Sequence, residues 1–414
     1  MSSEWVERSI VDVCAQVFSG GTPKSSIPEF FDRGSIPWLK TKEVNYSKII
    51  ETENFITELG LKNSSAKLVP INSVIVAMYG NGDTAGRVAI NKIALTTNQA
   101  CCNLVIDSAR ADYRFVYYYL QSQYAKLVDL KNGGAQQNLN AKLIKDYPII
   151  VPSITEQREI GSFLESLDDR ISLLCETNAT LEDIAQALFK SWFVDFDPVH
   201  ARARGEQPAG LAPEVAALFP DSFEESALGM IPRGWKLMQF GEFIDRQSVG
   251  KKYDQKSALE EGSVPILDQG KSGVIGFHND KPSVCASLVS PVVVFANHTC
   301  YMRLITFDFS AIQNVLPFIG KGVDTVWAFY ATKDRVKFSE YKGHWPEFVI
   351  QKTIVPNQEL TEIFRNMVDP LICSMRNNEL QAQTLANLRD TLLPRLISGQ
   401  LRLPEAEAMV EGAS

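Results

Sequence analysis

Apolar residues recur every seven positions through one long stretch of this chain, at Ile160, Leu167, Leu174, Leu181 and Leu188. This spacing is typical of a helix whose apolar stripe packs against another helix in a coiled coil. The helix is expected to begin at Ser153, whose hydroxyl can cap it, and to run to about Lys190. At about 1.5 Å per residue it would be about 55 Å long. A helix of this length needs a partner that covers its stripe.

A second stretch of the same chain supplies that partner. Adding 204 to each position of the first stripe leads to Phe364, Leu371, Asn378, Leu385 and Leu392. Both stretches also follow similar sequences, IVPS at 150–153 and IVPN at 354–357. We interpret the chain as an internal duplication whose two helices pair antiparallel, rather than as two helices that pack only on their own domains.

Polar residues and a proline interrupt this pattern. Asn178 and Asn378 lie at or beside the stripe, where a polar side chain either fixes the pairing register of the helices or faces solvent at the edge. Pro370 lies inside the second helix. Because proline lacks the backbone N–H, it is expected to kink this helix or to delay its regular start.

The remaining segments contain short β-type runs separated by turn residues, such as 73–79, 87–93, 102–106 and 148–151. In the first segment helical character is confined to about 114–130. We therefore predict an α+β fold with an internal pseudo-two-fold duplication, in which two α+β domains are separated by a pair of long antiparallel coiled-coil helices. The predicted boundaries are 1–151 for the first domain, 152–193 for the first helix, 194–230 for a linker, 231–356 for the second domain, 357–403 for the second helix and 404–414 for a flexible tail.

The net charge of -8 at first argues against a nucleic-acid partner, because phosphate binding needs surplus Lys and Arg. The charge is unevenly distributed, however. Residues 1–150 hold 16 basic and 14 acidic side chains and residues 231–356 hold 15 and 12, so the acidity belongs to the helices and the linker. The two mildly basic domains permit a surface that faces DNA.

The composition and motifs exclude several classes of site. The seven cysteines include no CxxC pair and the four histidines are scattered, so neither structural disulfides nor a zinc site is expected. The chain lacks a GxSxG turn, an HExxH pair and the NPP-aromatic signature of amino-methyltransferases, so no catalytic activity is expected. No apolar run approaches the roughly 20 residues that span a bilayer, and we expect a cytoplasmic protein without a membrane partner.

Aromatic residues gather at the end of the first helix, at Phe189, Trp192, Phe193 and Phe196. Exposed aromatic side chains beside a linker are costly without a partner, which favours a docking site for another subunit. The alternative is an internal core that covers the helix end. The sequence alone leaves both interpretations open.

Several motifs of the chain resemble one known family. These motifs are AxxLFKSWFVDFDPV at 185–199, SGGTPK at 19–24, TNQA at 97–100, PSxxEQxxI at 152–160, IPxGW at 231–235 and LLPRLISGQLRL at 392–403. Together they resemble the DNA-specificity subunit of type I restriction-modification systems, over nearly the whole chain. The chain departs from this pattern at Pro370 and in the loops of the second domain, which show little motif-level match.

The resemblance implies a non-catalytic subunit with two target-recognition domains, each of which reads one half of an asymmetric bipartite double-stranded DNA target in the major groove. The helices would set the spacing between the halves and dock two modification subunits, which carry S-adenosylmethionine and methylate adenine. Two restriction subunits would join with ATP and Mg²⁺, and this chain itself would bind no cofactor and no metal. The alternatives are a stand-alone DNA methyltransferase or nuclease, and a coiled-coil scaffold that binds only proteins.

Base edges are read by polar and basic side chains on loops that a rigid scaffold holds. The predicted DNA contacts of the first domain are Thr22, Lys24, Lys40, Lys42, Asn81, Thr84, Gln136 and Gln137, and those of the second domain are Lys251, Lys252, Gln269, Lys271, His298 and His344. The loop YGNGDTAG at 79–86 superficially suggests a phosphate loop, but it matches neither GxGxxG nor GxxxxGK(S/T). A polar loop that faces DNA is therefore favoured over a nucleotide site.

Overall fold

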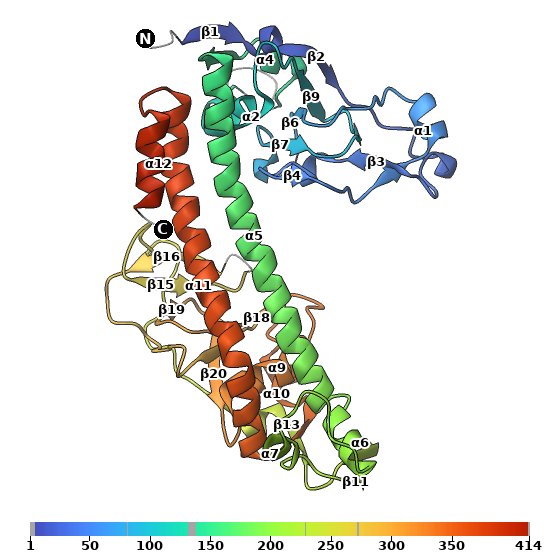
Figure 1. Ribbon diagram of the computed structural model, residues 1–414, viewed down its shortest axis with the longest axis vertical. Helices are drawn as coiled ribbons and strands as arrows, with labels where there is room; N and C mark the ends of the chain where they lie inside the picture. The colour runs from blue at the N-terminus through green and yellow to red at the C-terminus, as the bar shows by residue number, and fades with distance from the viewer. Residues whose placement is uncertain (1–4, 81, 131–137, 228, 271–272, 413–414) are drawn as a thin grey trace. The chain divides into compact units, whose positions relative to one another are not determined.

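The chain divides into two compact units in the computed structural model, which describes residues 5–80, 82–130, 138–227, 229–270 and 273–412. The first unit holds Met1–Leu173 and Gln381–Ser414, and the second holds Leu174–Leu380. Two helices of 40 residues, α5 (Ile154–Phe193) and α11 (Gln358–Ile397), contribute one part to each unit and are drawn in green and red in Figure 1. Within the described ranges, no helix is long and apolar enough to cross a membrane.

The first unit contains a five-stranded sheet of order β2-β9-β6-β7-β4, a three-stranded sheet of order β5-β3-β8 and the antiparallel pair β1-β10. Its strands are β1 (Val6–Ser9), β2 (Cys14–Ser19), β3 (Ile36–Leu39), β4 (Lys48–Ile49), β5 (Phe55–Ile56), β6 (Val74–Ala77), β7 (Val88–Asn91), β8 (Thr96–Thr97), β9 (Cys101–Ile106) and β10 (Pro148–Val151). Its short helices are η1 (Ile10–Val13), η2 (Pro28–Phe30), η3 (Thr41–Glu43), α1 (Glu58–Lys62), η4 (Gly82–Thr84), α2 (Tyr113–Ser122), α3 (Tyr124–Asp129), α4 (Ala141–Lys145) and α12 (Leu403–Glu411). The strands predicted in this segment correspond to β6, β7, β9 and β10, and the predicted helix is divided into α2 and α3.

The core of the first unit joins the sheet to both long helices. Phe115 and Tyr118 of α2 are buried in one cluster with Ile160 near the start of α5 and with Leu392 and Leu396 near the end of α11. The start of one long helix therefore packs beside the end of the other in this unit, as antiparallel helices do.

The second unit contains a four-stranded sheet of order β14-β20-β17-β18, a three-stranded sheet of order β16-β15-β19 and the pairs β13-β21 and β11-β12. Its strands are β11 (Phe223–Ser226), β12 (Gly229–Pro232), β13 (Lys236–Gln239), β14 (Ile244–Arg246), β15 (Val264–Leu267), β16 (Val274–His278), β17 (Val292–Ala296), β18 (Met302–Ile305), β19 (Ser310–Ala311), β20 (Val315–Gly320) and β21 (Lys352–Val355). Its short helices are α6 (Asp197–Ala203), α7 (Pro213–Ala216), α8 (Phe240–Phe243), α9 (Thr325–Thr332) and α10 (Trp345–Val349).

The core of the second unit is rich in aromatic side chains. Trp192 and Phe193 at the end of α5 are buried with Trp327 of α9 and with Phe364 near the start of α11. The predicted linker 194–230 belongs to this core, since Phe219 is buried within it. The prediction of an open surface connection is wrong for this part of the chain, because its apolar residues pack inward.

The strand orders of the two units correspond. The series β2, β9, β6 and β7 of the first unit matches β14, β20, β17 and β18 of the second, and β5-β3-β8 matches β16-β15-β19. The central strand of each small sheet pairs antiparallel on one side and parallel on the other. Among the described residues, β4 of the first unit has no counterpart in the second.

In each unit, a matching hydrogen bond joins the start of a short helix to a long helix. The N–H of Asp112, the N-cap of α2, donates to Gln157 Oε1 at 3.0 Å, and the N–H of Asp324, the N-cap of α9, donates to Thr361 Oγ1 at 2.9 Å. Gln157 lies near the start of α5 and Thr361 near the start of α11. Both units therefore fasten an equivalent helix end to an equivalent position on a long helix.

Three predictions concern the long helices and the segment that follows the second of them. Ser153 caps α5 as predicted, since its hydroxyl accepts from the N–H of Glu156 at 3.3 Å. Helix α11 runs through Pro370 from Gln358, so its regular start is not delayed. The segment predicted as a flexible tail forms α12 (Figure 1), and Ala406 of this helix is buried in the core of the first unit, so that prediction is wrong.

Asparagines meet between the two long helices in the second unit. Asn378 Nδ2 donates to Asn178 Oδ1 at 2.8 Å, and Asn178 Nδ2 donates to the Met375 carbonyl at 3.0 Å. The two side chains thus bond across the helix pair instead of facing solvent at its edge. A polar pair inside an apolar stripe favours one pairing register, because any shift would leave these groups without partners.

Candidate nucleic-acid interface

Loops that the sequence singles out converge at one end of the large sheet in the first unit. At this end Ser19 of β2 pairs with Cys102 of β9, and Ala77 of β6 pairs with Cys101. The segments after β2, after β6 and before β9 therefore leave the sheet together. The segment after β3 joins them, because the N–H of Asn98 donates to the Leu39 carbonyl at 2.9 Å. A rigid sheet thus presents several polar loops on one side, as base reading requires.

The loop that follows β2 is packed tightly on the turn before β9. The Trp38 indole donates to the Gly21 carbonyl at 3.1 Å, and the Thr22 hydroxyl donates to Gln99 Oε1. A Cβ added at Gly20 would lie 2.2 Å from Thr97 Oγ1, so this approach needs glycine. Thr22 and Lys24 remain exposed at the surface of this packed pair of loops.

Lys40 and Lys42 follow β3, and they differ in how free their ammonium groups are to bind a phosphate. Lys40 is half-buried, lies 5.0 Å from the centroid of the Trp38 ring and donates to Asn54 Oδ1 at 3.0 Å. Lys42 is exposed and forms an ion pair with Glu53. The hydrogen bond to Glu53 raises the pKa of the Lys42 ammonium, which stays charged at neutral pH. A phosphate would have to compete with Glu53 for Lys42 but not with a carboxylate for Lys40.

The other predicted contacts of the first unit are only partly described. Thr84 is half-buried in η4. Asn81, Gln136 and Gln137, like Lys271 of the second unit, lie outside the described residues. The described chain resumes at residue 138 beside the same end of the sheet, because the N–H of Leu139 donates to the Met78 carbonyl at 3.0 Å.

The equivalent end of the sheet gathers the predicted loops of the second unit. Ala296 of β17 pairs there with Val315 of β20, and the N–H of Asn297 donates to the Asn314 carbonyl at 2.9 Å. The segment after β15 joins this end, because the N–H of Ile312 donates to the Leu267 carbonyl at 3.0 Å. Lys251, Lys252, Gln269 and His298 all lie on segments that leave from this end.

Lys251 and Lys252 are both exposed, yet they are not equivalent. Lys251 forms an ion pair with Asp280 at 2.7 Å and lies 4.9 Å from the centroid of the Tyr253 ring. The hydrogen bond to Asp280 raises the pKa of the Lys251 ammonium. Lys252 is therefore the better candidate for a phosphate contact, because its charge is not already paired with Asp280.

Gln269 and His298 lie together on adjoining loops. The N–H of His298 donates to Gln269 Oε1 at 2.9 Å, and the Thr299 hydroxyl donates to the Gln269 carbonyl at 2.5 Å. His298 also stacks on Tyr341, with ring centroids 4.7 Å apart and an interplanar angle of 14°. The structure therefore brings these two predicted contacts, which lie far apart in the sequence, into one cluster.

The prediction for His344 requires correction. This side chain has no exposed surface, and its ring nitrogens lie 3.0 Å from Glu347 Oε2 and 3.2 Å from the Glu340 carbonyl. A histidine enclosed in this way does not reach a base edge, because its hydrogen-bonding atoms are already occupied. Its role is to hold the segment before α10, where the N–H of His344 donates to the Asn297 carbonyl at 2.9 Å.

The aromatic cluster at the end of α5 also requires correction. Phe189, Trp192 and Phe193 are buried in the core of the second unit, and Phe196 is half-buried against Trp235, with ring centroids 5.7 Å apart. These side chains are not free to dock another subunit, because this unit already covers them. The alternative interpretation, an internal core at the helix end, is confirmed.

Two further residues lie at these loop clusters and are not among the predicted DNA contacts. Tyr341 is 83% exposed, and it lies on the loop YKGHW whose histidine alone was selected. Lys67 lies 5.7 Å from the centroid of the Phe18 ring and follows Ala66, which contacts Gly21. An aromatic residue between charged residues in a polar loop could have identified Tyr341. No local pattern points to Lys67, because its position depends on packing.

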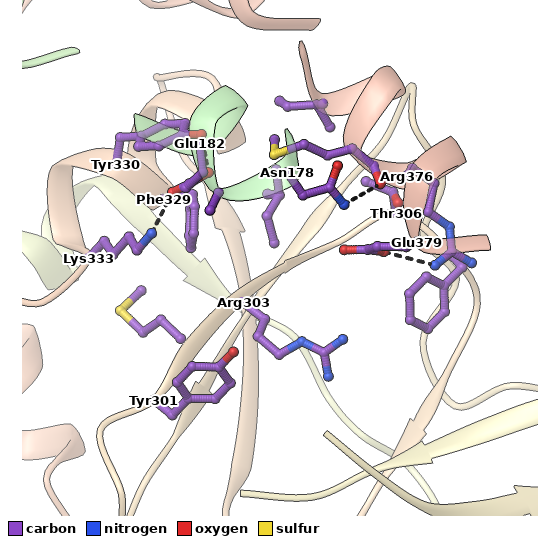
Figure 2. Close-up of a pocket in the computed structure, with 16 residues that line it drawn as sticks. Asn178, Glu182, Tyr301, Arg303, Thr306, Phe329, Tyr330, Lys333, Arg376 and Glu379 are labelled. Carbon is purple, nitrogen blue, oxygen red and sulfur yellow. Dashed lines mark hydrogen bonds and ion pairs between the residues drawn. The ribbon is translucent and has the colours of Figure 1, made fainter. Parts of the chain in front are cut away.

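A cavity of 340 Å³ in the second unit, shown in Figure 2, holds charged groups that are largely paired with one another. Glu182 accepts from the Lys333 ammonium and, at 2.9 Å, from the Tyr330 hydroxyl, and Arg376 pairs with Glu379 at 3.2 Å. Burial alone would raise the pKa of Glu182, but the hydrogen bonds from Lys333 and its other donors outweigh it and lower that pKa. Glu182 is therefore an ionised structural partner and is unsuited to proton donation near neutral pH.

Metal chemistry finds no set of ligands among the described residues. No group of three or more His, Cys, Asp or Glu side chains there is arranged to hold a metal ion. The described sites consist of polar loops on a rigid sheet, an arrangement that can present side chains to a surface.

Comparisons with known proteins point to one family. A family model described as the type I restriction modification DNA specificity domain matches residues 2–183. The chain is 25% identical to the type I restriction enzyme MjaIX specificity subunit of Methanocaldococcus jannaschii, a match that covers 97% of this chain and 94% of that protein. It is 24% identical to the HindI specificity subunit of Haemophilus influenzae, over 68% of this chain and 74% of that protein.

A comparison of structures agrees on the fold. The crystal structure of the type I restriction-modification S subunit from M. genitalium superposes with a TM-score of 0.58 at 17% identity, and the match covers 95% of this chain and 96% of that one. At this level of identity the likeness concerns the fold alone.

Proposed function

We propose that this chain is the non-catalytic subunit that selects the DNA sequence on which a type I restriction-modification complex acts, because the specificity-domain model matches residues 2–183 and the MjaIX specificity subunit is similar over 97% of the chain. Each unit reads one half of an asymmetric bipartite target in the major groove of double-stranded DNA. The observation that carries this proposal is the convergence of polar loops at the equivalent sheet end of both units. The two sets of loops differ in sequence, so the two half-sites differ as well.

The long helices form an antiparallel coiled-coil pair that sets the spacing of the half-sites, and the two units arise from an internal duplication with pseudo-two-fold symmetry. The matching strand orders support this proposal, as do the bonds of Asp112 to Gln157 and of Asp324 to Thr361, two helix positions that lie 204 residues apart. Half-site readers that share a symmetric scaffold set the spacing of their targets by geometry. The Asn178–Asn378 bond fixes the register on which that spacing depends.

The partners are two modification subunits, which carry S-adenosylmethionine and methylate adenine, and two restriction subunits, which use ATP and Mg²⁺. This chain binds no cofactor itself and works in the cytoplasm, where it meets DNA. The modification subunits dock on exposed faces of the long helices, because the aromatic cluster at the end of α5 is already enclosed. Leu173 and Ile184 of α5, both at least half exposed, are apolar positions on such faces.

The predicted DNA contacts divide into two groups. Lys24 and Lys252 are exposed and suit phosphate contacts, which strengthen binding to every sequence. Gln269 and His298 carry both donors and acceptors and suit base edges, which distinguish sequences. Thr22, Lys40, Lys42, Thr84 and Lys251 are proposed as supporting contacts on the same loops, and the same role is proposed for Asn81, Gln136, Gln137 and Lys271.

A binding and methylation experiment tests this function. The chain, co-purified with its cognate modification subunit, is expected to shift a specific duplex in an electrophoretic assay and to direct methyl transfer to adenine within it. The chain alone is expected to transfer no methyl group. Methyl transfer or cleavage by the chain alone would instead support a stand-alone enzyme, and protein assembly without specific DNA binding would support a scaffold.

A further inference from the structure

The backbone around His298 selects one tautomer of its neutral imidazole. Its Nδ1 atom lies 2.9 Å from the Lys342 carbonyl. A carbonyl oxygen only accepts hydrogen bonds, so Nδ1 must carry the proton. In the neutral ring Nε2 is then an acceptor with an unshared lone pair.

Among the described residues, no group forms a hydrogen bond with the Nε2 atom of His298. The buried side-chain polar atoms that lack a hydrogen-bond partner among the described residues belong to Gln121, His278 and Trp327, and not to His298. His298 thus places a nitrogen at the sheet end where the loops of the second unit converge. In the neutral ring this nitrogen can accept a hydrogen bond but cannot donate one.

Tyr341 and Gln269 hold this acceptor in place. The His298 ring stacks on the highly exposed Tyr341, so the ring plane is fixed from one side. Gln269 Oε1 accepts from the N–H of His298, which assigns the oxygen and directs the Gln269 amide nitrogen, a donor, elsewhere. The cluster therefore combines a rigid acceptor with an adjacent donor.

His278, on β16 of the same unit, shows that this state is specific to the site. Its Nδ1 accepts from the N–H of Asp280 at 3.0 Å, so the proton of the neutral ring lies on Nε2. That side chain is only 4% exposed. The two histidines thus adopt opposite tautomers, and only His298 presents its free nitrogen outward.

We propose that His298 is a specificity-determining residue of the second unit, which uses Nε2 to accept a hydrogen bond from the exocyclic amino group of a base in the major groove. Adenine N6 and cytosine N4 are the groups that offer such a donor. The amide nitrogen of Gln269 donates a hydrogen bond to an acceptor beside that amino group. On adenine this acceptor is N7 of the same base. This inference rests on the proposed DNA-reading function. It adds which atom donates and which accepts the hydrogen bond in one base contact.

The test removes amino groups from the DNA and the acceptor from the protein. The complex with the modification subunit is bound to its mapped target, in which each adenine is replaced in turn by purine and each cytosine by pyrimidin-2-one. One such replacement in one half-site is expected to weaken binding by the wild-type complex about tenfold. The His298→Ala complex is expected to bind the intact target about tenfold more weakly and to be insensitive to that same replacement. Whether purine or pyrimidin-2-one gives this result identifies adenine or cytosine.

Three further variants distinguish base reading from general damage. Tyr341→Phe keeps the stacked ring and is expected to bind like the wild type, whereas Tyr341→Ala is expected to reduce discrimination at the His298 position. His200→Ala removes an exposed histidine of α6 and is expected to leave the scan unchanged.

The outcomes separate this inference from the proposed function. If the His298→Ala complex retains the full sensitivity pattern of the wild type, the inference is wrong while DNA reading stands. If the wild-type complex shows no sequence preference at all, the proposed function itself fails.

Discussion

The two units share a strand order but fasten it to the long helices by different chemistry. In the first unit the fastening is ionic: Glu165 of α5 accepts from Lys48 at 3.0 Å, Lys92 at 3.3 Å and Arg114 at 3.4 Å. Asp168, one turn further along α5, pairs with Arg389 of α11 at 2.6 Å. Lys48 lies on β4, the strand that has no counterpart among the described residues of the second unit.

In the second unit the fastening is largely aromatic. The Phe364 ring lies 5.6 Å from Phe189, 5.5 Å from Phe193 and 5.7 Å from Tyr330, measured between centroids. Ion pairs also join this unit to the long helices, from Lys333 to Glu182 of α5 and from Asp324 to Arg365 of α11. Topology alone therefore does not dictate the interactions, and the two halves should respond differently to truncation, acid and salt.

The largest expected effect is truncation of the aromatic core. Trp192→Ala should lower the free energy of unfolding of the second unit by about 3 to 5 kcal/mol, because it removes a fully packed ring and leaves a cavity. Peptide-resolved hydrogen exchange would report faster exchange in α9 and the start of α11. Leu396→Ala is the matched control in the first unit, and it should instead make hydrogen exchange faster in α2. Uniform exchange changes in both variants would contradict the distinction.

The next effect concerns the ion pair of the first unit. Asp168→Asn should destabilise that unit by about 1 to 3 kcal/mol, because it leaves the half-buried Arg389 without its counter-ion and weakens the bond from the Tyr118 hydroxyl. Denaturant unfolding followed by hydrogen exchange measures the loss. The double variant Asp168→Asn/Arg389→Met should recover part of it. Strictly additive losses would show that the pair does not interact.

Acid should weaken the ionic fastening first. Burial alone would raise the pKa of Glu165, but the hydrogen bonds from Lys48 and Lys92 outweigh it and lower that pKa. A lowered folded pKa gives stability that is present above the unfolded value of about 4.3 and is lost as pH falls through the folded pKa. Exchange protection of the first unit should therefore drop as the pH falls below that range. In Glu165→Gln this drop should be smaller by roughly 1 kcal/mol.

The second unit provides the control for acid sensitivity. Glu182 also has a lowered pKa, so Glu182→Gln should reduce acid sensitivity there in the same direction. The aromatic core should retain most of its protection in acid, because none of its rings titrates in this range. Equal loss of protection in both units would contradict the contrast between ionic and aromatic fastening.

The smallest expected effect concerns phosphate contacts. Lys24→Ala should weaken binding of the complex to all sequences alike and reduce the salt slope of log Kobs by about 1. Lys42→Ala should have a smaller effect, because Lys42 is already paired with Glu53. Binding titrations at several salt concentrations measure both slopes. A change in target sequence in Lys24→Ala would assign this residue to base reading instead.

The sequence predicted the features that depend on local pattern. The seven-residue repeat led to α5 and α11, and the asparagines of that repeat meet at Asn178 and Asn378. Loop composition led to Gln269 and His298, which share one cluster. Helix α12 could also have been predicted, because Pro404 is its second residue and the Glu405 carboxylate accepts from the N–H of Arg402 at its start.

Features that depend on distant packing could not be predicted. Trp192 is enclosed by rings such as Phe364 and Trp327, which lie more than a hundred residues away in the sequence. His344 has the same residue type as His298, but its side chain is fully buried where its backbone N–H donates to the carbonyl of Asn297, far earlier in the sequence. Residue type identified the candidates, and burial then selected among them.

The sequences methylated in cells that express this chain with its modification subunit test the central claim most directly. Single-molecule sequencing of the genomic DNA should show methylated adenines in two unlike half-sites separated by a fixed unspecified gap. The His298→Ala variant should relax one position in one half-site and leave the other half-site unchanged. A palindromic or uninterrupted target would contradict the account, because two units with different loops could not then be reading the two halves independently.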